Sequence, residues 1–107
     1  MPDTTPLTDA VERLADRLRA LPQSALRRGA AAEGLALAQE LALRAQRLEF
    51  PDEDRKRLIP DAGEFAVGDQ LAVAGHDLAA ALHGVDEDAA RGELDGALRL
   101  VRESPLS

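Results

Sequence analysis

The chain has 107 residues, the length of one domain, and a formal net charge of −7. It contains no cysteine, which excludes disulfides and thiolate metal sites, and no apolar run approaches the roughly 18 residues of a membrane span. Residues 1–60 are balanced in charge and residues 61–107 hold the whole net charge, which argues against a nucleic acid as the partner.

Alanine and leucine dominate the composition, with 21 and 18 copies, against two phenylalanines and no tryptophan or tyrosine. Both are strong helix formers and β-branched residues are scarce, so the sequence predicts an all-α fold. Twelve arginines against one lysine are typical of a GC-rich genome, and we expect a bacterial source. The first five residues have neither a basic residue nor an apolar run, so we expect a cytoplasmic protein.

The first predicted helix covers residues 8–21 and follows an extended lead-in at residues 1–6. Large apolar residues recur at alternating spacings of four and three, which is typical of a helix with one buried face. These residues are Leu7, Val11, Leu14, Leu18 and Leu21. Thr8 or Asp9 is expected to cap the helix, and Asp9 to pair with Arg13 one turn later.

The second predicted helix covers residues 24–49, with Ser24 as its cap. It is apolar on more than one side, which is typical of a helix that contacts two neighbours or a second subunit. It approaches about 40 Å in length, against about 20 Å for the first helix, so part of it stays uncovered within one chain. We therefore expect a homodimer. Gly29 and Gly34 mark a close crossing or a bend, and a separate turn over residues 24–29 stays open.

Residues 50–61 form a long loop, because two prolines and a charged block prevent a regular helix. The whole connection extends to residue 63. Leu58 and Ile59 are expected to pin it onto the bundle. A loop of this length is above the usual range, which often indicates function or mobility.

The last two predicted helices cover residues 62–83 and 86–103. Asp61 and Glu64 have the form of a capping box for the third helix, and Asp86 is expected to begin the fourth.

Gly68 and Gly75 lie seven residues apart on the apolar face of the third helix, so a partner helix can approach closely there. Short turns join the first two and the last two helices, and the long loop can also join antiparallel neighbours. The sequence therefore predicts a single domain over residues 1–107, folded as an all-α, up-down-up-down four-helix bundle.

His76 and His83 are the only histidines, and with Asp69 they follow one line of the third helix at seven-residue steps. Seven helical residues span about 10 Å, which is too far for both rings to bind one metal ion. Di-iron bundles need a glutamate three residues before each histidine, where Val73 and Ala80 stand. We interpret the line as a polar stripe that faces solvent, and we expect neither a metal nor a cofactor.

The segment His76-Asp77-Leu78-Ala79-Ala80-Ala81-Leu82 resembles the H-box of sensor histidine kinases, His-Glu-Leu-Arg-Thr-Pro-Leu, at three of its seven positions. That box lies on a helical hairpin that dimerises into a four-helix bundle. The resemblance implies that His76 accepts a phosphoryl group and that Asp77 acts as its acid/base neighbour. A histidine phosphotransfer protein or ligand-responsive regulator centred on His76 is therefore the alternative function.

Two local basic clusters, Arg27-Arg28 and Arg55-Lys56-Arg57, could bind an anion or RNA. No tryptophan or tyrosine is available to stack on bases, and the second cluster follows an acidic run. We interpret both clusters as solvated charge runs.

A carboxylate metal site like that of the all-α nucleotide pyrophosphohydrolases is suggested by Asp52, Glu53, Asp54, Asp61 and Glu64. Those enzymes use paired acidic motifs on helices. Only Asp9-x-x-Glu12 and Asp61-x-x-Glu64 approach that pattern, and both are better explained as helix caps.

The predicted function is a non-enzymatic helical protein–protein interaction module or a small regulatory protein. We expect a homodimer and a further protein partner at the acidic half, residues 61–107, without membrane or nucleic-acid binding. The residues expected at the interface are Leu35, Leu37, Leu41, Leu48, Gly68 and Gly75.

Overall fold

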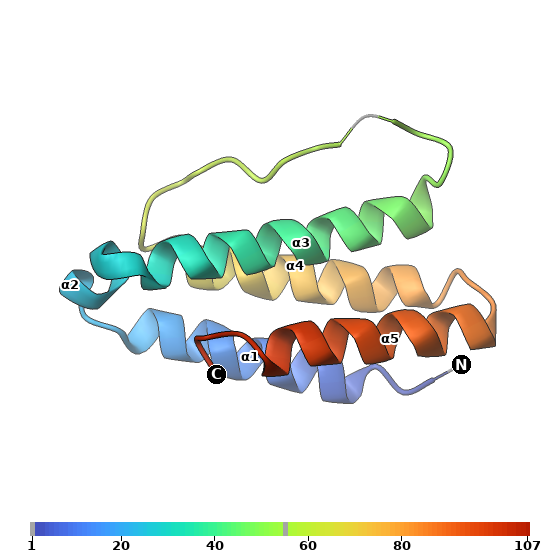
Figure 1. Ribbon diagram of the computed structural model, residues 1–107, viewed down its shortest axis with the longest axis horizontal. Coiled ribbons are helices and arrows are strands. Elements are labelled where there is room, and N and C mark those ends of the chain that lie inside the picture. The colour runs from blue at the N-terminus through green and yellow to red at the C-terminus, as the bar shows by residue number, and fades with distance from the viewer. Residues whose placement is uncertain (1, 55) are drawn as a thin grey trace.

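The computed structural model describes residues 2–54 and 56–107, and every regular element within them is helical. Figure 1 shows four long helices: α1 (Thr5–Ala20), α3 (Ala31–Glu49), α4 (Val67–Leu82) and α5 (Glu87–Arg102). A short helical turn, α2 (Gln23–Ala25), and a kinked segment, η1 (Leu26–Ala30), connect α1 to α3. The predicted all-α four-helix fold is confirmed.

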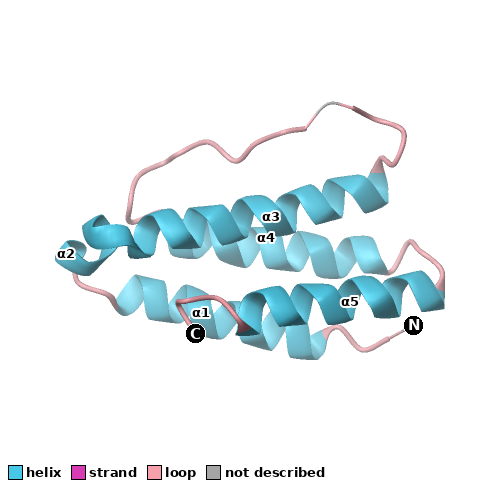
Figure 2. Cartoon of the chain, viewed as in Figure 1, coloured by secondary structure: helices cyan, strands magenta, loops and turns pink. Residues whose placement is uncertain are grey.

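The direction of α4 differs from the expected up-down-up-down order. Residues 50–54 and 56–63, which we call the strap, return along the length of α3, so that α4 runs parallel to α3, as Figure 1 and Figure 2 show. Gly34, near the start of α3, accordingly faces Val67, the first residue of α4. Fourteen extended residues reach roughly 46 Å, which exceeds the roughly 28 Å of a helix as long as α3, so the crossover needs no strain.

The helix predicted over residues 24–49 is interrupted at Gly29, whose φ of 145° and ψ of −17° are not helical. Glycine adopts a positive φ of this kind at little cost, whereas other residues do not. The continuous helix predicted over residues 24–49 is therefore wrong, and the turn that the sequence left open precedes α3. This turn begins at Gln23 after Pro22, so Ser24 is not its cap. With 19 residues, α3 nearly matches the 16 of α1, and the length mismatch that predicted an uncovered helix disappears.

The predicted start of the first helix is wrong. α1 begins at Thr5, with Pro6 in its first turn. Backbone N–H groups in the first turn have no partner within the helix, so the missing N–H of proline costs nothing there. Thr8 and Asp9 therefore lie inside the helix instead of capping it. The carboxylate of Asp3 instead accepts a hydrogen bond from the backbone N–H of Thr5 at 3.0 Å.

The predicted start of the third helix is also wrong, because α4 begins at Val67. Asp61 accepts a hydrogen bond from the backbone N–H of Gly63 at 2.9 Å, and Gly63 has a φ of 95°, so the chain turns there. The cap expected for the fourth helix is confirmed. Asp86 accepts a hydrogen bond from the backbone N–H of Ala89 at 2.9 Å, at the start of α5.

The core lies between the four long helices and is aliphatic. α4 is the central helix and packs against both α1 and α3. Among the described residues no polar or charged side chain is buried, and no helix is long and apolar enough to cross a membrane. The largest fully buried side chains come from all four helices: Leu7, Val11, Leu41, Leu71, Leu78, Leu82 and Val101.

Candidate functional site

His76 lies on the outer side of α4, with 54% of its side chain exposed. Its Nε2 lies 2.8 Å from Oε1 of Glu12, so the ring connects α4 to α1. Asp69, one step earlier on the predicted polar line, accepts hydrogen bonds from Nη2 and Nε of Arg19 at 2.7 and 3.0 Å. His83 follows the last residue of α4 and is exposed. Two of the three residues on the line therefore form a polar seam between α1 and α4.

Arg19 is the centre of this seam. It also forms an ion pair with Asp16 at 3.0 Å, and its hydrogen bond to Asp69 raises the pKa of the guanidinium above its ordinary value. The side chains of the seam are all more than a third exposed, so each pair contributes about 0.2–1 kcal/mol at most. Nowhere in residues 2–54 and 56–107 do three metal-ligating side chains gather. The seam joins two helices and holds no desolvated reactive group.

Two glutamines of α3 hold the strap in an extended conformation. Gln39 donates to the backbone C=O of Ile59 at 2.6 Å and accepts from its N–H at 2.8 Å. Gln46 makes the same pair of bonds with Arg57, at 2.8 and 2.9 Å. Alternate residues of an extended chain direct their backbone groups to the same side, so both strap residues face α3. The two side-chain amides thus take the place of a neighbouring β-strand.

On the α4 side, the side chain of Gln70 donates a hydrogen bond to the C=O of Pro60 at 2.9 Å. Its other amide atom, Oε1, is buried and has no partner among the described residues. A buried acceptor without a donor costs about 1–3 kcal/mol, so the strap is held less completely by α4 than by α3.

An open cleft of about 450 Å³ lies between the strap, α3 and α4, and we call it the strap cleft. Leu58 of the strap and Val73 of α4 both line it, with 66% and 60% of their surface exposed. Its volume is within the range of small-molecule and side-chain pockets, and its lining is mostly apolar. The lining residues are Ala42, Gln46, Arg57, Leu58, Ile59, Pro60, Asp69, Gln70, Val73, Ala74 and Asp77.

Three of the four leucines predicted at a dimer interface, Leu37, Leu41 and Leu48, belong to the core of one chain or pack against it, whereas Leu35 does not. Leu37 and Leu41 are buried, whereas Leu35 and Leu48 are half-buried. Contact of these side chains with a second copy stays a prediction.

The two glycines predicted at that interface lie against α1 of the same chain. A β-carbon on Gly75 would come 2.5 Å from Cγ1 of Val11, and one on Gly68 would come 3.0 Å from the carbonyl oxygen of Ala15. The close helix approach expected at these glycines is therefore made within the chain.

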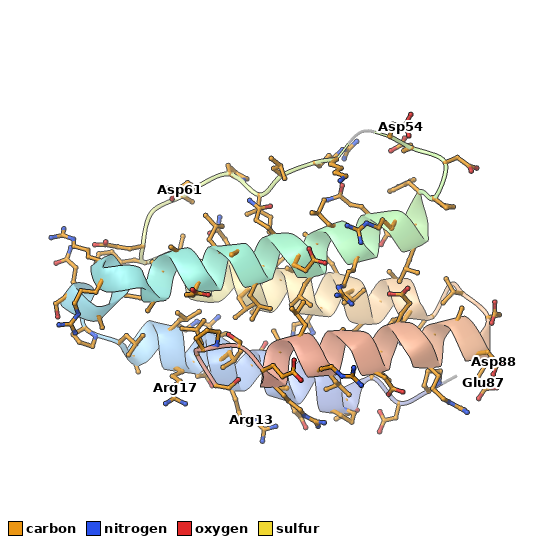
Figure 3. All side chains as sticks on the ribbon, in the orientation of Figure 1. Arg13, Arg17, Asp54, Asp61, Glu87 and Asp88 are labelled. Carbon is orange, nitrogen blue, oxygen red and sulfur yellow. The ribbon has the colours of Figure 1, made fainter. Side chains whose placement is uncertain are left out.

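The charged clusters singled out in the sequence remain exposed. Arg27 pairs with Glu64 at 3.3 Å, which ties η1 to the chain just before α4. The run Asp52–Asp54 is exposed, and Figure 3 shows Asp54 on the outer side of the strap. Arg55, in the second basic cluster, lies outside the described residues. The clusters do not converge with the seam on one site.

Sequence reasoning missed the role of Gln39 and Gln46. The available signal was their seven-residue spacing, which places two amides on one face of a helix that precedes an unusually long loop. Such amides are suited to backbone groups that a loop leaves without partners.

No protein-family model matches this chain, and no curated protein or solved structure is significantly similar to it.

Proposed function

We propose that the protein is a non-enzymatic helical interaction module that binds an apolar side chain of a partner protein in the strap cleft. One observation carries the proposal. Four large apolar side chains are exposed among the described residues, and two of them, Leu58 and Val73, line this cleft, whereas Phe50 and Phe65 lie outside it. Exposed apolar groups that gather at a hollow are typical of binding surfaces.

The hydrogen bonds that hold the strap beside α3 support the same proposal. Gln39 and Gln46 each donate one hydrogen bond to the strap backbone and accept one from it, and these four bonds fix the strap before any partner arrives. A preformed site loses little conformational freedom on binding, so more of the contact energy remains as affinity.

The test uses a peptide selected on the full chain from a random display library. We expect the selected peptides to share an apolar residue, and fluorescence anisotropy to show at least about tenfold weaker binding to Val73→Asp. Ala32→Asp is the matched control, because Ala32 is exposed on α3 outside the cleft and the charge change is the same. Equal binding to Val73→Asp and to the control would contradict the proposal.

In the predicted homodimer, the partner that binds in the strap cleft is a second copy of this chain. We expect light scattering at micromolar concentration to give twice the mass of one chain, and Val73→Asp to return it to a single chain. The mass of one chain in the wild-type protein would contradict the homodimer, whereas the peptide experiment would still test the cleft.

Phosphotransfer at His76 is the alternative. Its support is the exposed ring, which the hydrogen bond to Glu12 holds in place. Asp77, its implied acid/base neighbour, lines the strap cleft. Incubation with phosphoramidate, followed by mass spectrometry, should give a phosphoryl adduct that His76→Gln abolishes without loss of stability. No adduct on the wild-type protein would contradict this alternative.

A further inference from the structure

Three arginines from the two ends of the chain meet at a second cleft, on the far side of the bundle from the strap. Arg13 and Arg17 lie one turn apart on α1, and Arg102 is the last residue of α5. They line a hollow of about 250 Å³ together with Ala10, Leu14, Val101 and Ser107. Figure 3 shows Arg13 and Arg17 extending from α1 on the side opposite the labelled strap residue Asp61.

None of these arginines has a carboxylate of a described residue within 4.0 Å. The pair expected between Asp9 and Arg13 is not formed. Arg19, Arg27, Arg44 and Arg91 do have such a partner, whereas Arg28, Arg47, Arg57 and Arg99 also lack one among the described residues. Like charges one turn apart on a helix destabilise it by a few tenths of a kcal/mol, roughly 0.2–0.5 kcal/mol. Arg13, Arg17 and Arg102 are distinguished because three arginines without a side-chain carboxylate partner line one hollow, in a chain of net charge −7.

The chemistry of the cleft defines the ligand it fits. Guanidinium groups present planar sets of donors that match phosphate oxygens, and several of them together balance a dianion better than a monoanion. Leu14 and Val101 are buried aliphatic residues at the same hollow, so its floor suits a small apolar group. The volume is below the roughly 300–1,000 Å³ of pockets for drug-sized molecules, so the ligand is compact.

We propose that the cleft of Arg13, Arg17 and Arg102 binds a small phosphate monoester whose organic group is apolar. The phosphate lies among the three guanidinium groups and the organic group covers Leu14 and Val101. The site shares no residue with the strap cleft, so the test of one site does not depend on the test of the other.

Phenyl phosphate is the probe, titrated into the full chain and followed through the side-chain NMR signals of the arginines. We expect saturable shifts of Arg13, Arg17 and Arg102 below about 10 mM ligand. Arg17→Gln/Arg102→Gln should weaken binding at least about tenfold. Arg28→Gln/Arg47→Gln is the matched control, because it removes two exposed arginines outside the cleft and should leave binding unchanged.

Two further probes separate the parts of the proposal. Inorganic phosphate lacks the apolar group and benzoate lacks the second negative charge, so each should bind several-fold more weakly than phenyl phosphate. Binding of either probe as tight as that of phenyl phosphate would overturn the assigned ligand class. Equal weakening by both double variants, or no saturation by about 10 mM phenyl phosphate, would overturn the site itself.

Discussion

Val11 of α1 lies so close to Gly75 of α4 that a β-carbon on the glycine would come 2.5 Å from Cγ1 of the valine. Real β-carbons do not approach other atoms so closely, so only glycine fits at this position. Gly34 of α3 is equally restricted, because its β-carbon would come 2.5 Å from Cγ1 of Val67. The distances from α4 to its two main neighbours are thus set by the absence of a side chain.

The interruption at Gly29 predicts the effect of adding a methyl group there. Gly29→Ala should lower the free energy of unfolding by about 1–3 kcal/mol, because a non-glycine residue is strained at a φ of 145°. No atom lies within 4 Å of the new β-carbon, so the cost comes from the backbone alone. Urea unfolding measures it. If residues 24–49 were one continuous helix, the same change would instead stabilise the protein by about 1 kcal/mol.

Replacing one of the two glutamines should free only the strap residue to which it is hydrogen-bonded. Gln39→Ala should speed amide hydrogen exchange at Ile59 and leave Arg57 protected, and Gln46→Ala should do the reverse. Each change removes two hydrogen bonds and should therefore cost about 1–3 kcal/mol of stability. The two variants serve as controls for each other. Simultaneous loss of protection at both amides in either variant would contradict separate attachment.

The start of α1 should depend on pH through Asp3. The hydrogen bond from the backbone N–H of Thr5 lowers the pKa of this carboxyl below 3.8, because it favours the charged form. The contribution of Asp3 is therefore complete above pH 3.8 and is lost as the pH falls through the lower, folded pKa.

The amide signal of Thr5, followed by NMR, should titrate with a midpoint below 3.8, and Asp3→Asn should abolish this titration. A midpoint at or above 3.8 would show that the carboxylate does not hold the first turn.

Features that depend on spacing along the chain could be predicted from the sequence. The stripe of Leu7, Val11, Leu14 and Leu18 is buried as its periodicity indicates, since burial of one face is what produces such a pattern. The cap at Asp86 also follows from local chemistry, because its hydrogen bond closes within three residues.

Features that depend on distant residues could not be predicted. The parallel course of α4 beside α3 follows from a strap held by Gln39 and Gln46, and periodicity carries no information about such bonds. Gly75 indicates a close helix contact in the sequence, but only the fold shows that the other helix is α1.

The same limit applies to the candidate sites. Leu58 was expected to pin the loop, yet it is exposed at the strap cleft beside Val73, fifteen positions later. The cleft of Arg13, Arg17 and Arg102 joins residues from the two ends of the chain, and no local pattern brings them together.

The close packing of α1 on α4 is tested most directly by comparing Gly75→Ala with Gly92→Ala in urea unfolding. Gly92 lies within α5 with no atom near its would-be β-carbon, so Gly92→Ala should raise the free energy of unfolding by about 0.5–1 kcal/mol. Gly75→Ala should lower it by about 1–3 kcal/mol, and by less when Val11 is also alanine. Stabilisation by both substitutions alike would contradict the contact between Val11 and Gly75.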